Sequence, residues 1–350
     1  MPLAARARYL VKAGIAGAQD ATGLLGRRLR KTFRYRAVVL MYHRVLPPAD
    51  AALTWSHPGI VVERDTFARQ MAALRRHFEV LSPDAFLAHL EEGKTFTRPA
   101  CLVTFDDGWL DNYEHAWPIL REHRIPALIF LPTAFIGTGE MFWQERLKRL
   151  LAGAIEGGRA DAGLREALRQ RLAQEGLSHL VGLPTDRVRS AVMDAVHARK
   201  DGGVDGSSAL IEDVARLAAA LPPSASPDAF MSWEMVREMA AAGIVFGAHG
   251  VTHRLMTAIG PDEVHRELGE ARATLAATLG DTPRTVSYPN GNWNADVAAA
   301  VRAAGYAAAF TTSEHAVTPA DDAASIGRVN IHQDATAHVP LFLARLCGAA

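Results

Sequence analysis

The stretch Cys101–Tyr113 has the sequence CLVTFDDGWLDNY, in which an apolar run is followed at once by two adjacent aspartates. A continuous apolar run of this length is typical of a strand that is buried on both faces. Two like charges at its end repel each other and do not improve the strand. Either one carboxylate holds a metal ion while its neighbour moves a proton, or both acids face water in a turn.

Similar apolar runs recur along the chain and alternate with helical patterns. Strands are expected at 37–45, 101–105, 127–131, 244–247, 285–289 and 306–312. Helices are expected at 65–78, from Ser82-Pro83 onward, and at 110–123, 262–279 and 295–304. Repeated alternation of strand and helix predicts an α/β fold with a mostly parallel sheet.

Residues of about 137–231 interrupt this alternation with several helix-like stretches and two loop-like ones. The predicted organisation is a basic N-terminal segment over 1–36, a barrel or sheet over 37–136 and 231–335, a helical insertion over 137–230, and a C-terminal helix over 336–350.

The amino-acid composition limits the classes of protein to which the chain can belong. The 350 residues are 49% hydrophobic and 22% charged, with 38 basic and 38 acidic residues, which favours a globular protein without a global attraction to nucleic acid. No apolar stretch reaches the roughly 18–20 residues that span a bilayer. Two cysteines, Cys101 and Cys347, argue against a disulfide framework and favour a cytoplasmic location.

The N-terminal segment departs from this neutral balance. Residues 1–36 contain nine Lys or Arg and a single acid, Asp20. Lys12 and Asp20 break its apolar part, so the segment is a poor signal-peptide core. A basic amphipathic segment predicts peripheral contact with an anionic membrane; the alternative is a solvated helix packed on the domain.

Polar residues follow four of the expected strands. They are His43, the pair Asp106 and Asp107, the HGVTH stretch His249–His253, and the YPNG stretch Tyr288–Gly291. Active sites of α/β folds lie at the carboxyl ends of the parallel strands, so these side chains are expected on one face. Two imidazoles and one carboxylate make a three-ligand site with an open position, and the second aspartate would take a proton from water.

The motifs TFDDG, HGVTH and YPNG together resemble those of the polysaccharide deacetylase family, carbohydrate esterase family 4. VLMYHRV and FARQMAAL resemble the leading segment of the same family, and the likeness covers roughly 37–136 and 231–332. This resemblance implies a distorted (β/α) barrel that removes N-acyl groups, usually acetyl, from amino sugars.

The resemblance also implies roles for single residues. Asp106 would be the catalytic base, and Asp107, His249 and His253 would bind a divalent metal, zinc above all, with cobalt or nickel as alternatives. The metal and a backbone N–H near Asn290, within Tyr288-Pro289-Asn290, would hold the oxyanion.

The sequence departs from the family pattern in three places. Gly250 stands where the family often has Ser or Thr, and Ser287 stands where it often has an Arg that contacts the catalytic Asp. Arg328 is the expected substitute for that Arg, and Arg284 a weaker one. In place of a Leu-x-His motif the chain has Asn330-Ile331-His332.

Several roles stay open at this point. The general acid is His332 or His43, and His43 is alternatively a buried histidine bonded to backbone. Asp111 is expected to cap a helix or to accept a hydrogen bond from a ligating histidine. Trp109 lines the sugar site or packs in the core.

The expected function is metal-dependent hydrolysis of the N-acyl group of an amino sugar in a polysaccharide or glycan precursor. The alternatives are a deformylase or other metallohydrolase acting on a lipid-linked sugar, and a non-catalytic glycan-binding relative.

Overall fold

A computed structural model describes residues 3–199, 206–219 and 227–348. The chain divides into two compact units. The first, here called the body, comprises 1–51, 58–139 and 229–350. The second, the helical unit, comprises 52–57 and 140–228.

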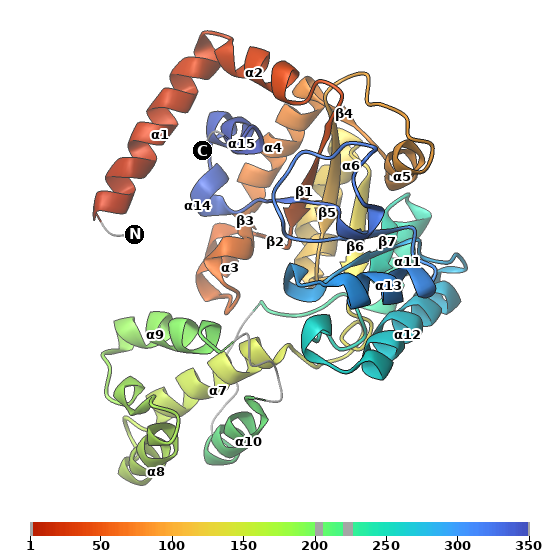
Figure 1. Ribbon diagram of the computed structural model, residues 1–350. Coiled ribbons are helices and arrows are strands. Elements are labelled where there is room, and N and C mark those ends of the chain that lie inside the picture. The colour runs from red at the N-terminus through yellow and green to blue at the C-terminus, as the bar shows by residue number, and fades with distance from the viewer. Residues whose placement is uncertain (1–2, 200–205, 220–226, 349–350) are drawn as a thin grey trace. The chain divides into compact units, whose positions relative to one another are not determined.

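The body is built on a parallel sheet with the strand order β10-β1-β5-β6-β7-β8-β9 (Figure 1). The strands are β1 (Ala37–Tyr42), β5 (Ala100–Phe105), β6 (Ala127–Leu131), β7 (Val245–Ala248), β8 (Thr285–Ser287), β9 (Ala308–Phe310) and β10 (Val329–Asn330). A short strand, β4 (Glu79–Val80), also pairs with β5. Because all of these pairs are parallel, the carboxyl ends of the strands lie on one side.

The adjacent strands β1, β5 and β6 are buried at every residue, as their uninterrupted apolar sequences predict. The expected strand over 37–45 is divided in the structure. β1 ends at Tyr42, and β2 (Arg44–Leu46) pairs with β3 (Val61–Glu63) in a separate two-stranded sheet.

Helices connect the strands and surround the sheet (Figure 1). Those of the body are α1 (Leu3–Ala21), α2 (Leu24–Thr32), α4 (Arg64–His77), α5 (Pro83–Glu91), α6 (Trp117–His123), α11 (Trp233–Ala241), α12 (Pro261–Leu279), α13 (Ala295–Ala303), α14 (Gln333–Thr336) and α15 (Val339–Leu346). α3 (Pro48–Leu53) begins in the body, and its last two residues belong to the helical unit. α5 begins as its sequence predicts, because the Ser82 hydroxyl accepts a hydrogen bond from the Ala85 N–H at 3.2 Å.

One short segment closes the curled sheet. Ile326 pairs in parallel with Phe310 of β9, and three residues later Val329 pairs with Leu40 of β1. The chain from 326 to 330 therefore crosses from one edge strand to the other. This arrangement confirms the distorted (β/α) barrel that the family resemblance implied.

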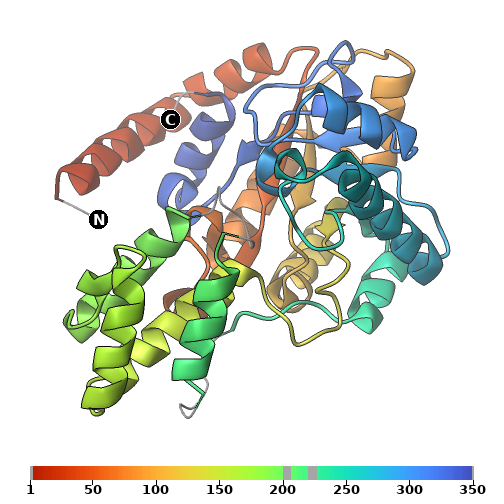
Figure 2. The same ribbon diagram turned by 60° about the horizontal axis from the view of Figure 1, so that its bottom comes forward.

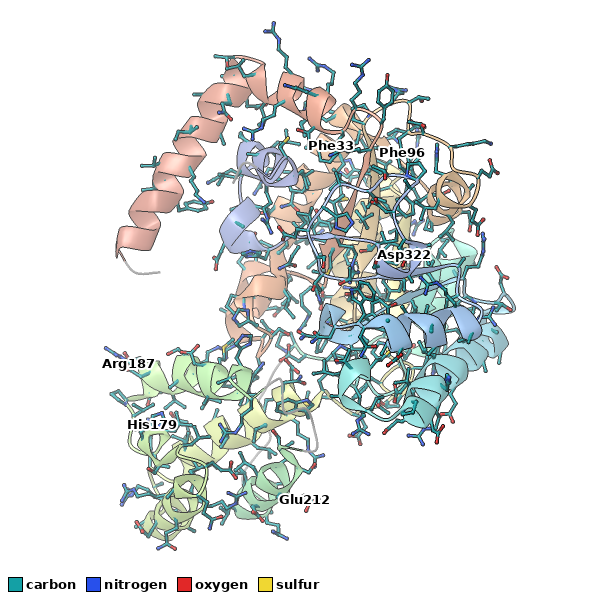
Figure 3. The ribbon with its side chains drawn as sticks, in the orientation of Figure 1. Phe33, Phe96, His179, Arg187, Glu212 and Asp322 are labelled. Atoms are coloured by element: carbon teal, nitrogen blue, oxygen red, sulfur yellow. The ribbon has the colours of Figure 1, made fainter. Side chains whose placement is uncertain are left out.

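The helical unit contains α7 (Trp143–Gly157), α8 (Ala162–Ala173), α9 (Thr185–His197) and α10 (Ser208–Leu217), which Figure 2 shows grouped together. Its core consists of aliphatic side chains at helical spacing, among them Leu147, Leu151, Leu168, Leu172, Val192 and Val214. The exposed Arg187 and Glu212 lie on the outside of α9 and α10 (Figure 3).

Within the described residues, no helix combines the length and the apolar character needed to cross a membrane.

Candidate active site

The two aspartates after β5 are both buried, with exposed fractions of 3% for Asp106 and 5% for Asp107. Asp106 continues the sheet, since its N–H donates to the Tyr42 carbonyl at 3.0 Å. Asp107 then adopts a left-handed conformation with a φ of 75°. Such backbone strain in a residue other than glycine is uncommon and concentrates at functional sites. A solvent-facing turn is therefore the wrong explanation of this pair.

Asp107 faces the two histidines of the HGVTH stretch. Its Oδ1 lies 3.5 Å from Nε2 of His249 and 3.4 Å from Nε2 of His253. One ligand atom from each of the three residues lies within 4.8 Å of the other two. Ligands about 2.0–2.1 Å from a tetrahedral zinc ion lie roughly 3.4 Å from one another, so this set has the spacing of a metal site.

The protonation of His249 is fixed by its neighbour. Its Nδ1 lies 2.7 Å from the Ser287 carbonyl oxygen, which can only accept a hydrogen bond. Nδ1 therefore carries the proton, and the lone pair of Nε2 is directed toward Asp107. Burial lowers the pKa of His249 to about 4, so this imidazole is neutral near pH 7. Neutral imidazole is the form that binds a metal ion.

Asp107 supplies the negative charge of the set. Burial alone raises its pKa, but the hydrogen bond with His253 and the charges of the nearby imidazoles outweigh burial and lower that pKa. Two imidazole nitrogens and one carboxylate oxygen match the donor set of divalent zinc, with cobalt and nickel as closely related ions. The residues present thus fit the metal that the sequence predicted.

The indole of Trp109 holds the other oxygen of Asp107. Trp109 Nε1 donates to Asp107 Oδ2 at 2.9 Å. The ring is 1% exposed, stacks on Phe230 at a centroid distance of 4.5 Å, and lies 4.2 Å from the Arg44 guanidinium. Both faces of the ring are covered, so Trp109 does not line a sugar site; its indole N–H instead positions Asp107, a candidate metal ligand.

Asp111 also differs from its prediction. Its carboxylate accepts from Arg44 Nε and from the Val45 N–H, each at 2.6 Å. It makes no side-chain capping bond to the helical turn that follows it, and neither His249 nor His253 is among these partners. Asp111 therefore fixes Arg44, which in turn packs on Trp109.

The loop that carries His253 is braced by Glu267 of α12. One carboxylate oxygen of Glu267 accepts from the N–H groups of Val251 and Thr252 at 2.6 and 2.9 Å, and the other accepts from the Thr252 hydroxyl at 2.5 Å. Gly250 has a φ of 73°, and a Cβ there would lie 2.7 Å from Glu267 Oε2. The missing Ser or Thr is thus explained, because Glu267 occupies the space.

Asp106 is held by Arg328, the substitute that the sequence analysis favoured. Nη1 and Nη2 of Arg328 contact the two carboxylate oxygens at 2.7 Å each, and Arg328 is fully buried. Burial raises the pKa of Asp106, but the Arg328 charge and hydrogen bonds and the nearby imidazoles outweigh it, so the pKa is lowered. Arg284, the weaker candidate, pairs instead with Glu91 at the surface.

Ser287 links the two halves of the site. Its hydroxyl accepts from Arg328 Nη2 at 2.8 Å and lies 3.3 Å from Asp106 Oδ2, while its carbonyl accepts from His249. From the sequence, Ser287 is notable only because it replaces the Arg of the family pattern, and these contacts were not predicted. Its position directly before the YPNG motif was the available signal.

The two candidate acids lie in different surroundings. Nε2 of His43 is 4.0 Å from Asp106 Oδ2, and Nδ1 of His43 is buried without a hydrogen-bond partner among the described atoms. His43 is thus not a ring bonded to backbone. Burial lowers the pKa of His332, and the charged groups acting on it are Asp334, Arg345 and Glu314 rather than the acids of the site. The geometry favours His43.

The YPNG segment offers fewer side chains for contact with a substrate than the sequence predicted. The hydroxyl of Tyr288 donates to the Ala324 carbonyl at 2.8 Å and its N–H donates to the Phe310 carbonyl at 3.0 Å, so neither is free for a substrate. Pro289 is buried. Asn290 is exposed and left-handed, with a φ of 57°. Its backbone N–H stays the predicted oxyanion donor.

Comparison with known proteins agrees with this geometry. The family model described as "Polysaccharide deacetylase" matches residues 93–181 and 211–309, together 188 of 350 residues. The chain belongs to the polysaccharide deacetylase family. The predicted enzyme class, hydrolases of carbon–nitrogen bonds other than peptide bonds, is confirmed at the level of this family.

Solved structures related to the family share the fold. The Streptococcus pyogenes deacetylase PplD, solved in complex with acetate, is 18% identical, with a TM-score of 0.55 over 89% of this chain and 98% of PplD. IcaB from Ammonifex degensii is 22% identical, with a TM-score of 0.55 over 88% of this chain and 97% of IcaB.

A curated protein of Bacillus subtilis, YxkH, whose name places it among the polysaccharide deacetylases, is 28% identical over 118 residues. The match covers 33% of this chain and 39% of YxkH, well under two thirds of that protein.

Proposed function

We propose that this protein is a metal-dependent deacetylase that hydrolyses the N-acetyl group of an amino sugar within a polysaccharide or glycan precursor. The observation that carries the proposal is the pairing of two adjacent buried carboxylates with different partners. Asp106 is fixed by Arg328, and Asp107 faces His249 and His253. One aspartate is thereby reserved for proton transfer and the other for a metal ion.

Asp107, His249 and His253 would hold the ion, which when bound supplies Lewis-acid polarisation of the amide carbonyl. Asp106 accepts a proton from a water molecule as that water attacks the carbonyl carbon. Arg328 and Ser287 hold the carboxylate in one orientation, so that its free lone pairs point to the water. The backbone N–H of Asn290 donates to the oxygen on which charge develops.

The second half of the reaction breaks the carbon–nitrogen bond. His43 is the proposed proton donor to the departing nitrogen, because its Nε2 lies 4.0 Å from Asp106 Oδ2. Acetate and a free amine leave. His332 stays the alternative donor, and replacing each histidine by Gln distinguishes them: the donor's variant loses kcat, and the other does not.

The test is acetate release from N-acetylated amino-sugar oligomers by metal-stripped protein, with zinc, cobalt or nickel added back. Asp106→Asn should bind metal normally and lose at least about 10²-fold in kcat. His253→Ala should lose both metal and activity. Asp84→Asn, an exposed aspartate on α5, serves as control and should change neither. Full activity of Asp106→Asn would overturn the assignment of the base, and metal binding without acetate release from any oligomer would overturn the deacetylase.

A further inference from the structure

We propose that α1 and α2 form a docking surface for an anionic lipid bilayer. In this arrangement the apolar side chains of one face of α1 enter the bilayer, and the basic side chains beside them contact lipid phosphates. The proposal does not depend on the chemistry of the active site.

The inner side of both helices is fixed to the body. Figure 1 shows α1 beside α15, and the ring centroids of Tyr9 and His338 lie 6.2 Å apart. Ala16 on α1 and the side chains Leu25 and Leu29 on α2 are buried. Phe33, labelled in Figure 3, packs on Phe78 with ring centroids 5.4 Å apart. The surface is thus preformed and needs little ordering on binding.

The opposite side of α1 is apolar and exposed. Leu10, Val11 and Ile15 are 61%, 61% and 55% exposed. They follow helical spacing and lie on the other side of the helix from the buried Ala16. Seven large hydrophobic side chains are strongly exposed among the described residues, and five of them belong to α1, α2 and the turn after α2. Single exposed apolar residues are ordinary, but a cluster marks an interaction site.

The charge around this face identifies the partner. Residues 1–36 carry nine basic residues and one acid, whereas the remaining 314 residues carry 29 basic and 37 acidic ones. Arg27, Arg28, Arg30 and Lys31 of α2 are all exposed. A segment that combines an exposed apolar helix face with many exposed basic side chains has the composition that binds the interface of an anionic membrane.

A second copy of the chain fits this surface less well. Pairing two α1 faces about a two-fold axis would bring together two segments with eight excess positive charges each. Like charges at an interface oppose association. A bilayer containing phosphatidylglycerol satisfies both the apolar and the basic parts of the surface.

Sedimentation of the full-length protein with vesicles tests the proposal. Binding is expected to vesicles of equal parts phosphatidylglycerol and phosphatidylcholine, to be weak with pure phosphatidylcholine, and to fall as NaCl is raised. The variant Leu10→Gln/Val11→Gln/Ile15→Gln should lower the partition coefficient at least about tenfold. Arg27→Gln/Arg28→Gln should lower it roughly 30-fold, from about fivefold per basic residue.

Matched controls separate docking from general effects. Leu53→Gln removes another strongly exposed leucine, 52% exposed against 61% for Leu10, that lies outside α1 and α2, and this variant should bind like the unchanged protein. Arg237→Gln/Arg266→Gln removes the same net charge on α11 and α12 and should also leave binding unchanged. Gln keeps helix propensity high, and circular dichroism of each variant checks the fold.

Two results would overturn the proposal. One is equal binding of both vesicle types, or no binding to either. The other is a concentration-dependent dimer that the triple Gln variant converts to a monomer while vesicle binding is unaffected, which would assign this face to a second copy.

Discussion

At the scale of single residues, the site depends on buried side chains that hold other side chains. The Trp109 indole N–H donates to Asp107, and the Arg328 guanidinium donates to Asp106. The Ser287 carbonyl accepts from His249 and thereby fixes its tautomer. None of these three is among the candidate metal ligands Asp107, His249 and His253. Such supporting contacts typically change metal affinity or activity by 10- to 100-fold when they are removed.

The first prediction concerns the indole N–H. Trp109→Phe keeps the aromatic packing on Phe230 but removes the hydrogen bond to Asp107 Oδ2. We expect zinc affinity to fall about tenfold or more, measured by competition with a chromogenic chelator. Trp117→Phe is the matched control, since the buried Nε1 of Trp117 has no partner among the described atoms, and zinc affinity there should not change. Equal losses in both variants would contradict the positioning role.

The second prediction concerns the buried ion pair. Arg328→Gln leaves the Asp106 carboxylate buried without its partner, so we expect a loss of about 3–5 kcal/mol in the free energy of unfolding. Asp106→Asn/Arg328→Gln should recover part of that loss, because no buried charge remains. Denaturant titration of Arg328→Gln, Asp106→Asn and the double variant measures the coupling free energy between Asp106 and Arg328.

An exposed pair serves as comparison. Arg302 binds Asp322, labelled in Figure 3, with both side chains about half exposed, and Arg302→Gln should cost under about 1 kcal/mol. A loss at Arg328 no larger than the loss at Arg302 would argue against burial as the source of the effect.

At the scale of elements, helices bring to the site side chains that the motifs at the strand ends do not contain. Glu267 projects from α12 to the loop between β7 and His253. After the DDG turn the expected helix over 110–123 starts as a π-helical turn, Asn112–Ala116, before α6. This turn directs the Asn112 side chain to the His43 carbonyl at 2.7 Å. A π-helical turn of this kind is frequent at functional sites.

The third prediction tests the brace on α12. Glu267→Gln replaces one accepting oxygen by an NH₂ group, which then faces an N–H or O–H donor. We expect a loss of about 1–3 kcal/mol in the free energy of unfolding and about tenfold in zinc affinity, because the loop of His253 loses its anchor. Calorimetry with and without zinc measures both.

The control lies on the same helix. Glu270 is exposed on α12, and Glu270→Gln should stay within about 0.5 kcal/mol of the unchanged protein and keep its zinc affinity. Unchanged zinc affinity in Glu267→Gln would show that the loop holds its shape without the carboxylate.

At the scale of the whole molecule, the chain folds as two compact units with separate cores. The helical unit includes the distant segment Ala52–His57, which buried polar bonds attach to it. Asp228 accepts from the Thr54 hydroxyl at 2.5 Å and from the Trp55 N–H at 2.8 Å. Lys148 Nζ donates to the Trp55 carbonyl at 2.9 Å.

The fourth prediction uses this division. Leu151 is fully buried in the core of the helical unit, and Leu151→Ala should destabilise that unit by about 2–5 kcal/mol. All three candidate metal ligands belong to the body, so zinc affinity should stay within about twofold. A thermal unfolding curve with an earlier first transition and unchanged zinc titration is the expected pair of results. Loss of zinc binding in step with loss of stability would mean that the two units do not unfold separately.

The sequence by itself determined the order of strands and helices and the chemistry at the strand ends. Apolar runs such as Ala127–Leu131 became β6 with the predicted bounds, because burial on both faces needs an uninterrupted apolar sequence. TFDDG and HGVTH supplied Asp107, His249 and His253, since parallel strands bring their carboxyl ends to one side. These features depend on local periodicity and residue type, which a sequence displays directly.

Only the tertiary structure decided which distant groups complete the site. The sequence offered both Arg328 and Arg284 as partners of Asp106, and the fold selects Arg328, 222 positions later in the chain, because its segment closes the sheet between β9 and β1. Glu267 occupies the space beside Gly250 because α12 packs against that loop. Trp109 is buried, so its ring does not contact a sugar. Contacts of this kind follow from the curl of the sheet and the packing of helices on it. No local pattern of residues records those long-range distances.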